Sequence, residues 1–337
     1  MILKRTITCF CFLILLSLGT ANAQTSFRWG INGHPLTQFD YNKNTWDQQI
    51  TFLKDLKLNT YRIDVPLNPQ GLPKNENAFQ NILDKLSSNS ITPFPVLIVT
   101  GLSGLNAEQV YALCNSQGKA FGLKYGKNLP YVEVGNEEDN KIILSGNGTK
   151  ASDFDADKAS RVIAKLKGFI DGLKSVQPDI KVSLSFSWVH FYYLEMLKQN
   201  NVNYDIVGCH WYSNMGGGDI TNANQFGNVL KLVKDRFNKD IWITEFNYWK
   251  GTKNGSGDYA KQADYLSKSL KTIISSNLVK GFFIYELFDQ NLISQRSQDE
   301  ANYGILSKGT SGSDYQKKDV YLVYKSFINA NVNANSR

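Results

Sequence analysis

The feature that most constrains the fold of this chain is a regular alternation between short apolar runs and longer amphipathic stretches. The short runs are rich in β-branched residues, as strands are, and the longer ones repeat apolar residues with a helical period. The strand-like runs are Phe27–Asn32, Thr60–Val65, Thr92–Val99, Tyr131–Val134, Val182–Phe186, Ile206–His210, Ile241–Phe246 and Gly281–Tyr285. The helical stretches are Thr45–Leu56, Phe79–Ser87, Ala107–Phe121, Ala156–Val176, Phe191–Asn200, Gln225–Phe237, Tyr259–Ser276 and Val320–Ala330. Eight strand–helix units predict an α/β fold with a single (β/α)8 barrel, or TIM barrel, and a doubly wound open sheet is the alternative.

The first residues are predicted to be a targeting segment rather than part of the barrel. Two basic residues precede an apolar run over residues 7–18, and an A-x-A cleavage pattern ends at Ala23. This order is typical of a secretory signal peptide. We therefore expect residues 1–23 to be removed and residues 24–337 to be the catalytic domain of a secreted or periplasmic protein. No later stretch is long and apolar enough to predict a membrane span.

Charge and motif content argue against several classes of function. The formal net charge is +7, but no run of Lys and Arg exceeds three residues, whereas nucleic-acid-binding proteins usually cluster their basic residues. No glycine-rich phosphate-binding motif follows the first strand, and the three histidines form neither an H-x-H nor an HExxH motif. We expect a monomer that needs no metal or other cofactor and binds no nucleic acid.

The loops predict where function lies. The stretches that follow strands are long and rich in Gly, Asn and Ser at residues 138–155, 213–224, 248–257 and 289–319, whereas the turns that follow helices are short. In (β/α)8 barrels, the loops that follow the strands form the active face. The functional residues are therefore expected at the C-terminal ends of the strands.

Polar and aromatic side chains gather at these strand ends. Two of the carboxylates among them are Glu137 after the fourth strand and Glu245 at the end of the seventh. They should converge over the barrel mouth, and glycoside hydrolysis requires such a pair. Strand alternation places Ile243 and Glu245 on one face and predicts that Glu245 points inward. The other candidates are Asn136, Arg62, His34, His210, Tyr212, Trp188, Trp249, Glu286 and Phe288.

Two segments resemble motifs of the clan A glycoside hydrolases. Val132–Asp139 reads VEVGNEED and Trp242–Trp249 reads WITEFNYW, which are similar to the Asn-Glu and Thr-Glu-Phe motifs of that clan. The resemblance extends over the mature chain and is shared among families 39, 51, 79 and 5. It implies a retaining (β/α)8 enzyme with its acid/base residue on the fourth strand and its nucleophile on the seventh.

The chain departs from the clan pattern at two places. Glu138 follows the acid/base glutamate, where many members have Pro. Residues Tyr285–Phe288 stand at the end of the eighth strand, where many members have Trp. Phe288 or Trp249 is then expected to supply the floor of the subsite that holds the reacting sugar.

The resemblance implies a role for each central residue. Glu137 would be the general acid and base, with a pKa raised by Glu245 and by partial burial. Glu245 would be the nucleophile, kept ionised by Arg62 and Tyr212. Asn136 would bind the sugar 2-OH, a contact that strengthens in the transition state. A retaining mechanism further predicts carboxyl groups about 5–5.5 Å apart.

Structural roles remain open for some of these residues. Arg62 could instead pair with Asp64 or Glu133, and His34 and His210 could be histidines with purely structural hydrogen bonds.

The sequence thus predicts a secreted retaining glycosidase that acts on β-linked poly- or oligosaccharides, with Trp188 and Trp249 placed to stack on sugar rings. A barrel that only binds carbohydrate is the alternative, but such a protein would be expected to lack one carboxylate of the pair. A metal-dependent barrel hydrolase would need strand ends rich in histidine, which this sequence lacks. The pattern does not specify the sugar.

Overall fold

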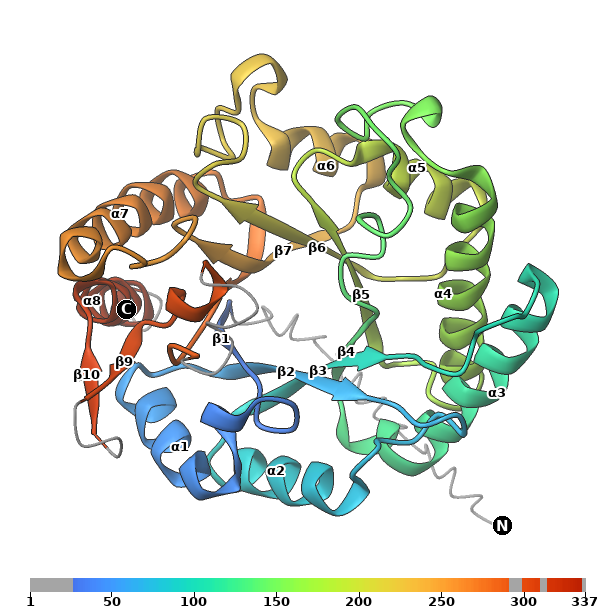
Figure 1. Cartoon of the computed structure of the whole chain (residues 1–337), viewed down its shortest axis with the longest axis horizontal. Coiled ribbons are helices and arrows are strands. Elements are labelled where there is room, and N and C mark those ends of the chain that lie inside the picture. The colour runs from blue at the N-terminus through green and yellow to red at the C-terminus, as the bar shows by residue number, and fades with distance from the viewer. Residues whose placement is uncertain (1–26, 291–298, 310–313, 335–337) are drawn as a thin grey trace, which may run out of the picture.

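A closed barrel of eight parallel strands lies at the centre of the structure, a computed structural model that describes residues 27–290, 299–309 and 314–334 (Figure 1). The strands follow one another around the barrel in chain order, and β1 pairs with β8 to close it. The prediction of a single-domain (β/α)8 barrel is therefore confirmed. The predicted signal peptide lies outside the described residues.

The elements alternate as the sequence pattern predicts, with small differences at their ends. The barrel strands are β1 Arg28–Gly33, β2 Thr60–Pro66, β3 Thr92–Ile98, β4 Tyr131–Val134, β5 Lys181–Ser187, β6 Ile206–Tyr212, β7 Asp240–Asn247 and β8 Val279–Ile284. The helices are α1 Trp46–Asp55, α2 Glu76–Ser88, α3 Ala107–Tyr125, α4 Ala156–Val176, α5 Phe191–Gln199, α6 Val229–Phe237, α7 Tyr259–Ser275 and α8 Asp319–Ala334. A short antiparallel hairpin, β9 Leu306–Lys308 and β10 Tyr315–Lys317, precedes α8.

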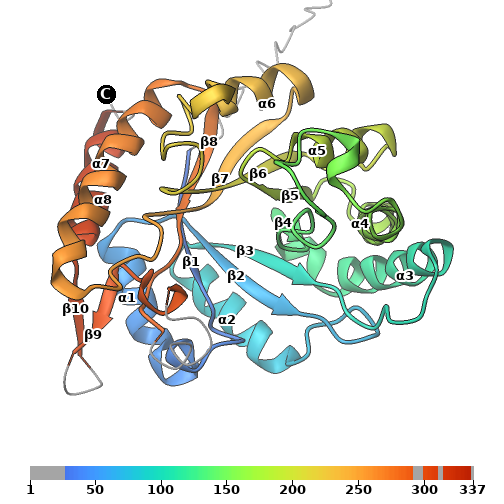
Figure 2. The same cartoon turned by 45° about the horizontal axis from the view of Figure 1, so that its top comes forward.

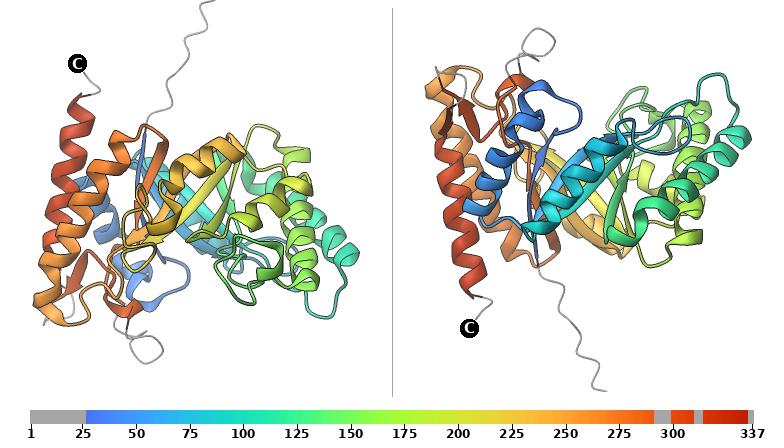
Figure 3. Two further views of the ribbon diagram at one scale, coloured as in Figure 1. Left: turned by 90° about the horizontal axis from the view of Figure 1, so that it is seen from above. Right: turned by 90° about the horizontal axis from the view of Figure 1, so that it is seen from below.

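The helices form an outer ring whose apolar faces pack on the barrel, as the tilted and side views show (Figures 2 and 3). α8 completes the ring beside α7 and α1. Its Tyr321 hydroxyl donates to Asp55 Oδ2 of α1 at 2.6 Å, and its Tyr324 hydroxyl donates to the Gly30 carbonyl of β1 at 2.8 Å. These contacts join the last element to the first and close the ring of helices.

An aromatic cluster fills part of the barrel interior. Phe94, Trp242 and Phe283 lie with ring centroids 5.2–5.7 Å apart, and Ile206 packs against them. A Cβ at Gly30 would lie 2.3 Å from the Phe283 ring, so the cluster needs a glycine there. Ile206 is the first residue of β6 and Trp242 the third of β7. The cluster therefore lies towards the N-terminal ends of these strands and leaves the other end to polar side chains.

One strand departs from simple alternation. Along the β6–β7 pairing, Cys209 faces Ile243 but His210 faces Glu245, so Thr244 is an extra residue in β7. Ile243 consequently belongs to the main apolar core, whereas Glu245 lines the pocket at the barrel mouth. The prediction that Ile243 and Glu245 share a face is wrong, because a bulge re-aims the side chain that follows it.

Candidate active site

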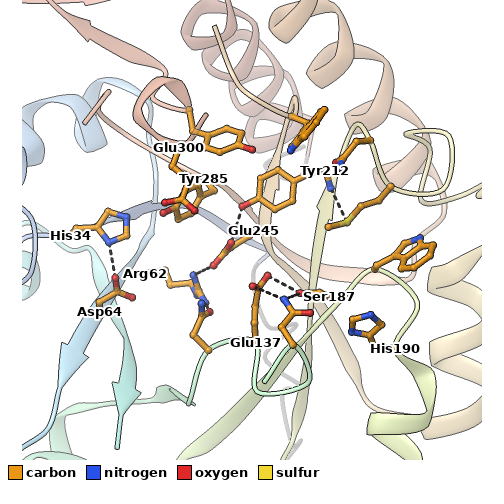
Figure 4. A pocket seen from close by; sticks show the side chains of 17 residues that line it. His34, Arg62, Asp64, Glu137, Ser187, His190, Tyr212, Glu245, Tyr285 and Glu300 are labelled. Carbon is orange, nitrogen blue, oxygen red and sulfur yellow. Dashed lines mark hydrogen bonds and ion pairs between the residues drawn. The ribbon is translucent and has the colours of Figure 1, made fainter. Parts of the chain in front are cut away.

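A pocket of about 620 Å³ opens at the C-terminal ends of the barrel strands (Figure 4). This volume lies in the usual range for small-molecule sites. Eight of the eleven candidates from the sequence line it: His34, Arg62, Asn136, Glu137, Trp188, Tyr212, Glu245 and Trp249. The structure adds nine lining residues that were not among the candidates: Asp64, Asn140, Ser187, His190, Asn214, Met215, Tyr285, Glu300 and Tyr303.

The Arg62 guanidinium connects four strands beneath this pocket. Its Nε and Nη2 donate to the two oxygens of Glu133 at 2.9 and 2.7 Å. Nη1 donates to Glu245 Oε1 at 2.8 Å and to Asn32 Oδ1 at 2.5 Å, and Nη2 also donates to Asn136 Oδ1 at 2.7 Å. All five N–H groups of the side chain are therefore used. Of the two roles considered for Arg62, the structure shows both, because it pairs with Glu133 and with Glu245.

Both oxygens of the Glu245 carboxylate are held in place. Arg62 Nη1 binds Oε1, and the Tyr212 hydroxyl donates to Oε2 at 2.8 Å. His210 Nδ1 lies 3.5 Å from Oε2. Burial raises the pKa of Glu245, while the positive charges of His210 and Arg62 oppose the rise and the Glu137 charge adds to it. The predicted contacts of Arg62 and Tyr212 are present, but burial outweighs their effect on this pKa.

Glu137 follows a tight turn at the end of β4. Gly135 and Glu137 both have positive φ values, 74° and 44°, so the chain bends sharply and turns the carboxylate into the pocket. Ser187 Oγ donates to Oε1 at 2.7 Å and Asn140 Nδ2 donates to Oε2 at 2.9 Å. His210 Nδ1 lies 2.8 Å from the same Oε1.

These contacts reverse the predicted pKa of Glu137. Burial favours a raised pKa, but the hydrogen bond and charge of His210 outweigh it, and together with Ser187 and Asn140 they lower the pKa of Glu137 to about 2. Burial lowers the pKa of His210, yet the carboxylates of Glu245 and Glu137 raise it above its usual range. The prediction of a raised Glu137 pKa is wrong because it did not place His210 beside this carboxylate. The proton of the pair resides on the imidazole.

Glu137, His210 and Glu245 form a compact group of ionisable side chains, with the two carboxylates in the pocket wall and His210 behind them. A carboxylate oxygen from each glutamate and a ring nitrogen of His210 all lie within 4.8 Å of one another. Such a group could hold a metal ion by distance alone. However, the Arg62 guanidinium lies 2.8 Å from Glu245, and a raised His210 pKa favours a proton on the ligand nitrogen. Both effects oppose a divalent cation at this place and favour proton transfer.

The two residues after Glu137 anchor its loop. Glu138 is buried and forms ion pairs with Lys165 of α4 and, at 2.8 Å, with Lys141. Asp139 is completely buried, and its Oδ2 accepts the backbone N–H of Ser187 at 2.8 Å. Glu138 therefore forms an ionic anchor at the position where many clan A enzymes have Pro.

A second charged group borders the pocket on the β1 and β2 side. His34 Nδ1 lies 2.7 Å from Asp64 Oδ2, and His34 Nε2 lies 3.2 Å from Glu286 Oε2. Burial lowers the pKa of His34, but the two carboxylates outweigh it and raise this pKa to about 10. His34 is therefore a cation between two acids. Asp64 keeps a partly exposed carboxylate in the pocket wall.

Three candidates are buried away from the pocket. His210 lies behind the two glutamates and touches both. Glu286 accepts a hydrogen bond from the Tyr41 hydroxyl at 2.7 Å and stands behind His34. Phe288 stacks on Tyr315 at 4.1 Å and is completely buried. The expectation that Phe288 forms the floor of a sugar subsite is wrong, since the chain turns inward after Tyr285 and leaves that residue in the pocket wall instead.

Comparisons with known proteins identify the family of this chain. A family model described as the glycosyl hydrolase catalytic core matches residues 123–312. A family 1 β-glucosidase from Thermotoga maritima has a similar structure, with a TM-score of 0.68, 15% identity, and coverage of 90% of this chain and 97% of that one. The β-glucosidase from Thermotoga maritima in complex with deoxynojirimycin has a TM-score of 0.66 and 16% identity, with coverage of 90% of this chain and 97% of that one. The complex with cyclophellitol has a TM-score of 0.66 and 15% identity, with coverage of 90% of this chain and 98% of that one. No curated protein matches.

The structural likeness establishes the barrel fold, and the family model spans β4 to β8 with both glutamates. These findings agree with the resemblance to glycoside hydrolases seen in the sequence. The chain belongs to the glycosyl hydrolase catalytic core family and is a glycoside hydrolase.

Proposed function

We propose that this protein cleaves β-linked poly- or oligosaccharides with retention of configuration, with Glu245 as the nucleophile and Glu137 as the acid and base. The observation that carries the proposal is the approach of the two carboxylates, which have oxygens within 4.8 Å of each other. Retaining enzymes hold these groups about 5–5.5 Å apart, whereas inverting enzymes separate them by about 6.5–9.5 Å to admit a water. The spacing favours direct attack on the sugar.

The contacts of Glu245 suit a nucleophile. Arg62 and Tyr212 each hold one oxygen, so the carboxylate is oriented before the substrate arrives. When a carboxylate oxygen attacks the anomeric carbon, its charge is lost, and Glu133 still neutralises Arg62. Asn136 Oδ1 accepts a hydrogen bond from Arg62, so the amide N–H groups of Asn136 remain to bind the sugar 2-OH.

The proton for the leaving group belongs to Glu137 and His210 together. As the glycosidic bond breaks, Glu137 donates a proton to the leaving oxygen and takes one from His210 Nδ1 across 2.8 Å. In the second step, Glu137 accepts a proton from the attacking water and His210 regains its own. The pair thus returns to its starting state after each turnover.

The charge of the pocket favours uncharged sugars. Asp64, Glu137, Glu245 and Glu300 line it, and Arg62 is the sole Lys or Arg among its described lining residues. Every N–H of Arg62 already has a partner. The other cation of the pocket wall, His34, is already paired with Asp64 and Glu286. A sugar carboxylate would therefore meet several acids and no unpaired cation, at a cost in desolvation and repulsion.

The proposed reaction is tested by replacing the two glutamates one at a time. Glu245→Ala should abolish hydrolysis, and added azide should then give a glycosyl azide of inverted configuration. Glu137→Ala should lose most activity on substrates with poor leaving groups, and azide should there give a product of retained configuration. Product configuration is read by NMR.

Glu108→Ala is the control, because Glu108 is an exposed carboxylate on α3, away from the pocket. It should keep the activity of the parent protein. Opposite stereochemistry in the two rescues would exchange the roles of the glutamates. Undiminished hydrolysis by both variants would refute the assignment.

The pH dependence of kcat/KM should report the shared proton. His210→Asn removes the group that stores this proton, so the alkaline limb should move to lower pH. The acid limb should move to higher pH, because Glu245 loses a nearby positive charge that lowers its pKa. Tyr212→Phe removes a hydrogen bond that lowers the Glu245 pKa, so it should move the acid limb to higher pH and leave the alkaline limb in place. An alkaline limb that does not respond to His210→Asn would exclude the shared proton.

The substrate class is tested with pairs of β-linked oligosaccharides that differ only in one group of the reacting sugar, a hydroxymethyl or a carboxylate. The neutral member should be cleaved at least about 10-fold faster, the effect of roughly 1.4 kcal/mol in the transition state. Equal or faster cleavage of the uronic acid member would contradict the preference for uncharged sugars.

We also propose that the enzyme is exported, with polysaccharide degradation as its setting. The support is the charged start, the apolar run and the A-x-A pattern before residue 24. Among the described residues, none of the helices is long and apolar enough to cross a membrane. Expression of the full chain with its native N-terminus should give an exported protein that mass spectrometry shows to begin at Gln24. Retention in the cytoplasm with an intact N-terminus would contradict export.

A further inference from the structure

The turn between β5 and α5 contributes three of four consecutive side chains to the pocket. Ser187, Trp188 and His190 line it, while Val189 is buried in the core. Ser187 holds Glu137, but the mechanism proposed above uses neither Trp188 nor His190. Figure 4 shows His190 beyond Ser187, on the far side of Glu137 from Glu245.

The backbone of this turn is strained in a way that brings the indole to the pocket. Trp188 has a φ of 52°, a left-handed conformation that is rare and strained for a bulky side chain. Such strain persists only where the surroundings enforce it. Trp188 Nε1 is buried without a hydrogen-bond partner among the described residues. A strained aromatic residue with an unused donor is expected at a ligand site.

Asp139 enforces the turn from the neighbouring loop. Its Oδ2 accepts the backbone N–H of Ser187 at 2.8 Å and lies 2.6 Å from His190 Nδ1. On the opposite side, Gly148 packs so closely that a Cβ there would lie 2.4 Å from His190 Cδ2. The imidazole is therefore held from two sides.

His190 does not use its side chain as a helix cap would. It is the N-cap residue of α5, but its side chain makes no capping hydrogen bond. Its Nδ1 is bound to Asp139 and the ring lies in the pocket wall. Asp139 binds Nδ1, so Nε2 is the ring nitrogen that remains for a ligand in the pocket.

The position of the turn relative to the glutamates indicates which part of a substrate it meets. Glu245 attacks the anomeric carbon and Glu137 protonates the glycosidic oxygen, so the leaving group lies on the Glu137 side. Ser187, one residue before Trp188, is in contact with Glu137. His34 and Asp64 border the pocket on the other side, beyond Arg62 (Figure 4).

We propose that Trp188 and His190, positioned by Asp139, form the binding site for the leaving-group sugar. The indole stacks on the ring of that sugar, and His190 Nε2 forms a hydrogen bond with one of its hydroxyls. This inference rests on the proposed function, because it takes the roles of the two glutamates as given. It identifies the natural leaving group as a sugar, so the substrate is an oligo- or polysaccharide rather than a simple glycoside.

The test compares two substrates that share the reacting sugar. One is the β-linked oligosaccharide that the parent enzyme cleaves fastest, and the other is the methyl β-glycoside of the same sugar, whose leaving group needs protonation just as a sugar does but is too small to reach Trp188 or His190. His190→Ala and Asp139→Asn should each lower kcat/KM for the oligosaccharide about 10-fold, the effect of one lost hydrogen bond. Hydrolysis of the methyl glycoside should change less than about twofold.

Glu138→Gln is the matched control, since Glu138 anchors the same loop through Lys165 without touching the β5 turn. It should affect both substrates equally. Equal losses on both substrates in His190→Ala would overturn the proposal, because they would show that the turn merely supports Glu137. A parent enzyme that hydrolyses neither substrate would instead refute the proposed function. Trp188→Ala gives a second measurement, with the same selectivity expected, should Asp139→Asn fail to fold.

Discussion

The active site depends on one buried cation, Arg62. Its five donors engage Glu133 on β4, Glu245 on β7, Asn32 on β1 and Asn136 after β4, so one side chain joins strands far apart in sequence. A buried guanidinium with an unpaired donor would be costly, and here each donor has a partner. Glu133 supplies a bidentate contact to Arg62 that does not depend on Glu245. In the proposed mechanism, Glu245 can therefore lose its charge as the nucleophile without leaving a buried cation uncompensated.

Much of the fold could be predicted because it follows from simple periodicity. The alternation of apolar runs with amphipathic stretches identified every barrel strand and each of the eight helices, and the long loops pointed to the C-terminal mouth. Periodicity does not, however, reveal where a strand carries a single extra residue. The bulge at Thr244 separates Ile243 from Glu245, and no composition signal marks it. The inward direction of Glu245 was predicted, but from an alternation that the strand does not follow.

The side-chain network was only partly accessible from the sequence. The spacing of Ser183, Ser185 and Ser187 along β5 is a period-2 pattern of small polar residues, and it could have indicated a polar inner face that reaches Glu137. The prediction that Phe288 forms the floor of a sugar subsite was wrong because an aromatic residue after a strand end is compatible both with a core position and with a sugar subsite. The contact between His210 and Glu137 joins β6 to the loop after β4 and has no local signature.

In the proposed mechanism, the contact between His210 and Glu137 also decides how Glu137 acts as an acid. Two carboxylates alone would raise each other's pKa, and one of them would stay protonated because the charge of the other opposes its ionisation. With His210 between them, the proton moves to the imidazole, and Glu137 is ionised while remaining one short hydrogen bond from a proton donor. Two glutamates and one histidine in the same field titrate as a unit, so their protonation belongs to the group rather than to one residue. In the proposed mechanism, Glu245 no longer stabilises the charged imidazole once it is esterified, and the proton becomes easier to release. Glu137 then faces the incoming water as a base, and the neutral imidazole beside it can take up the proton that the water gives up.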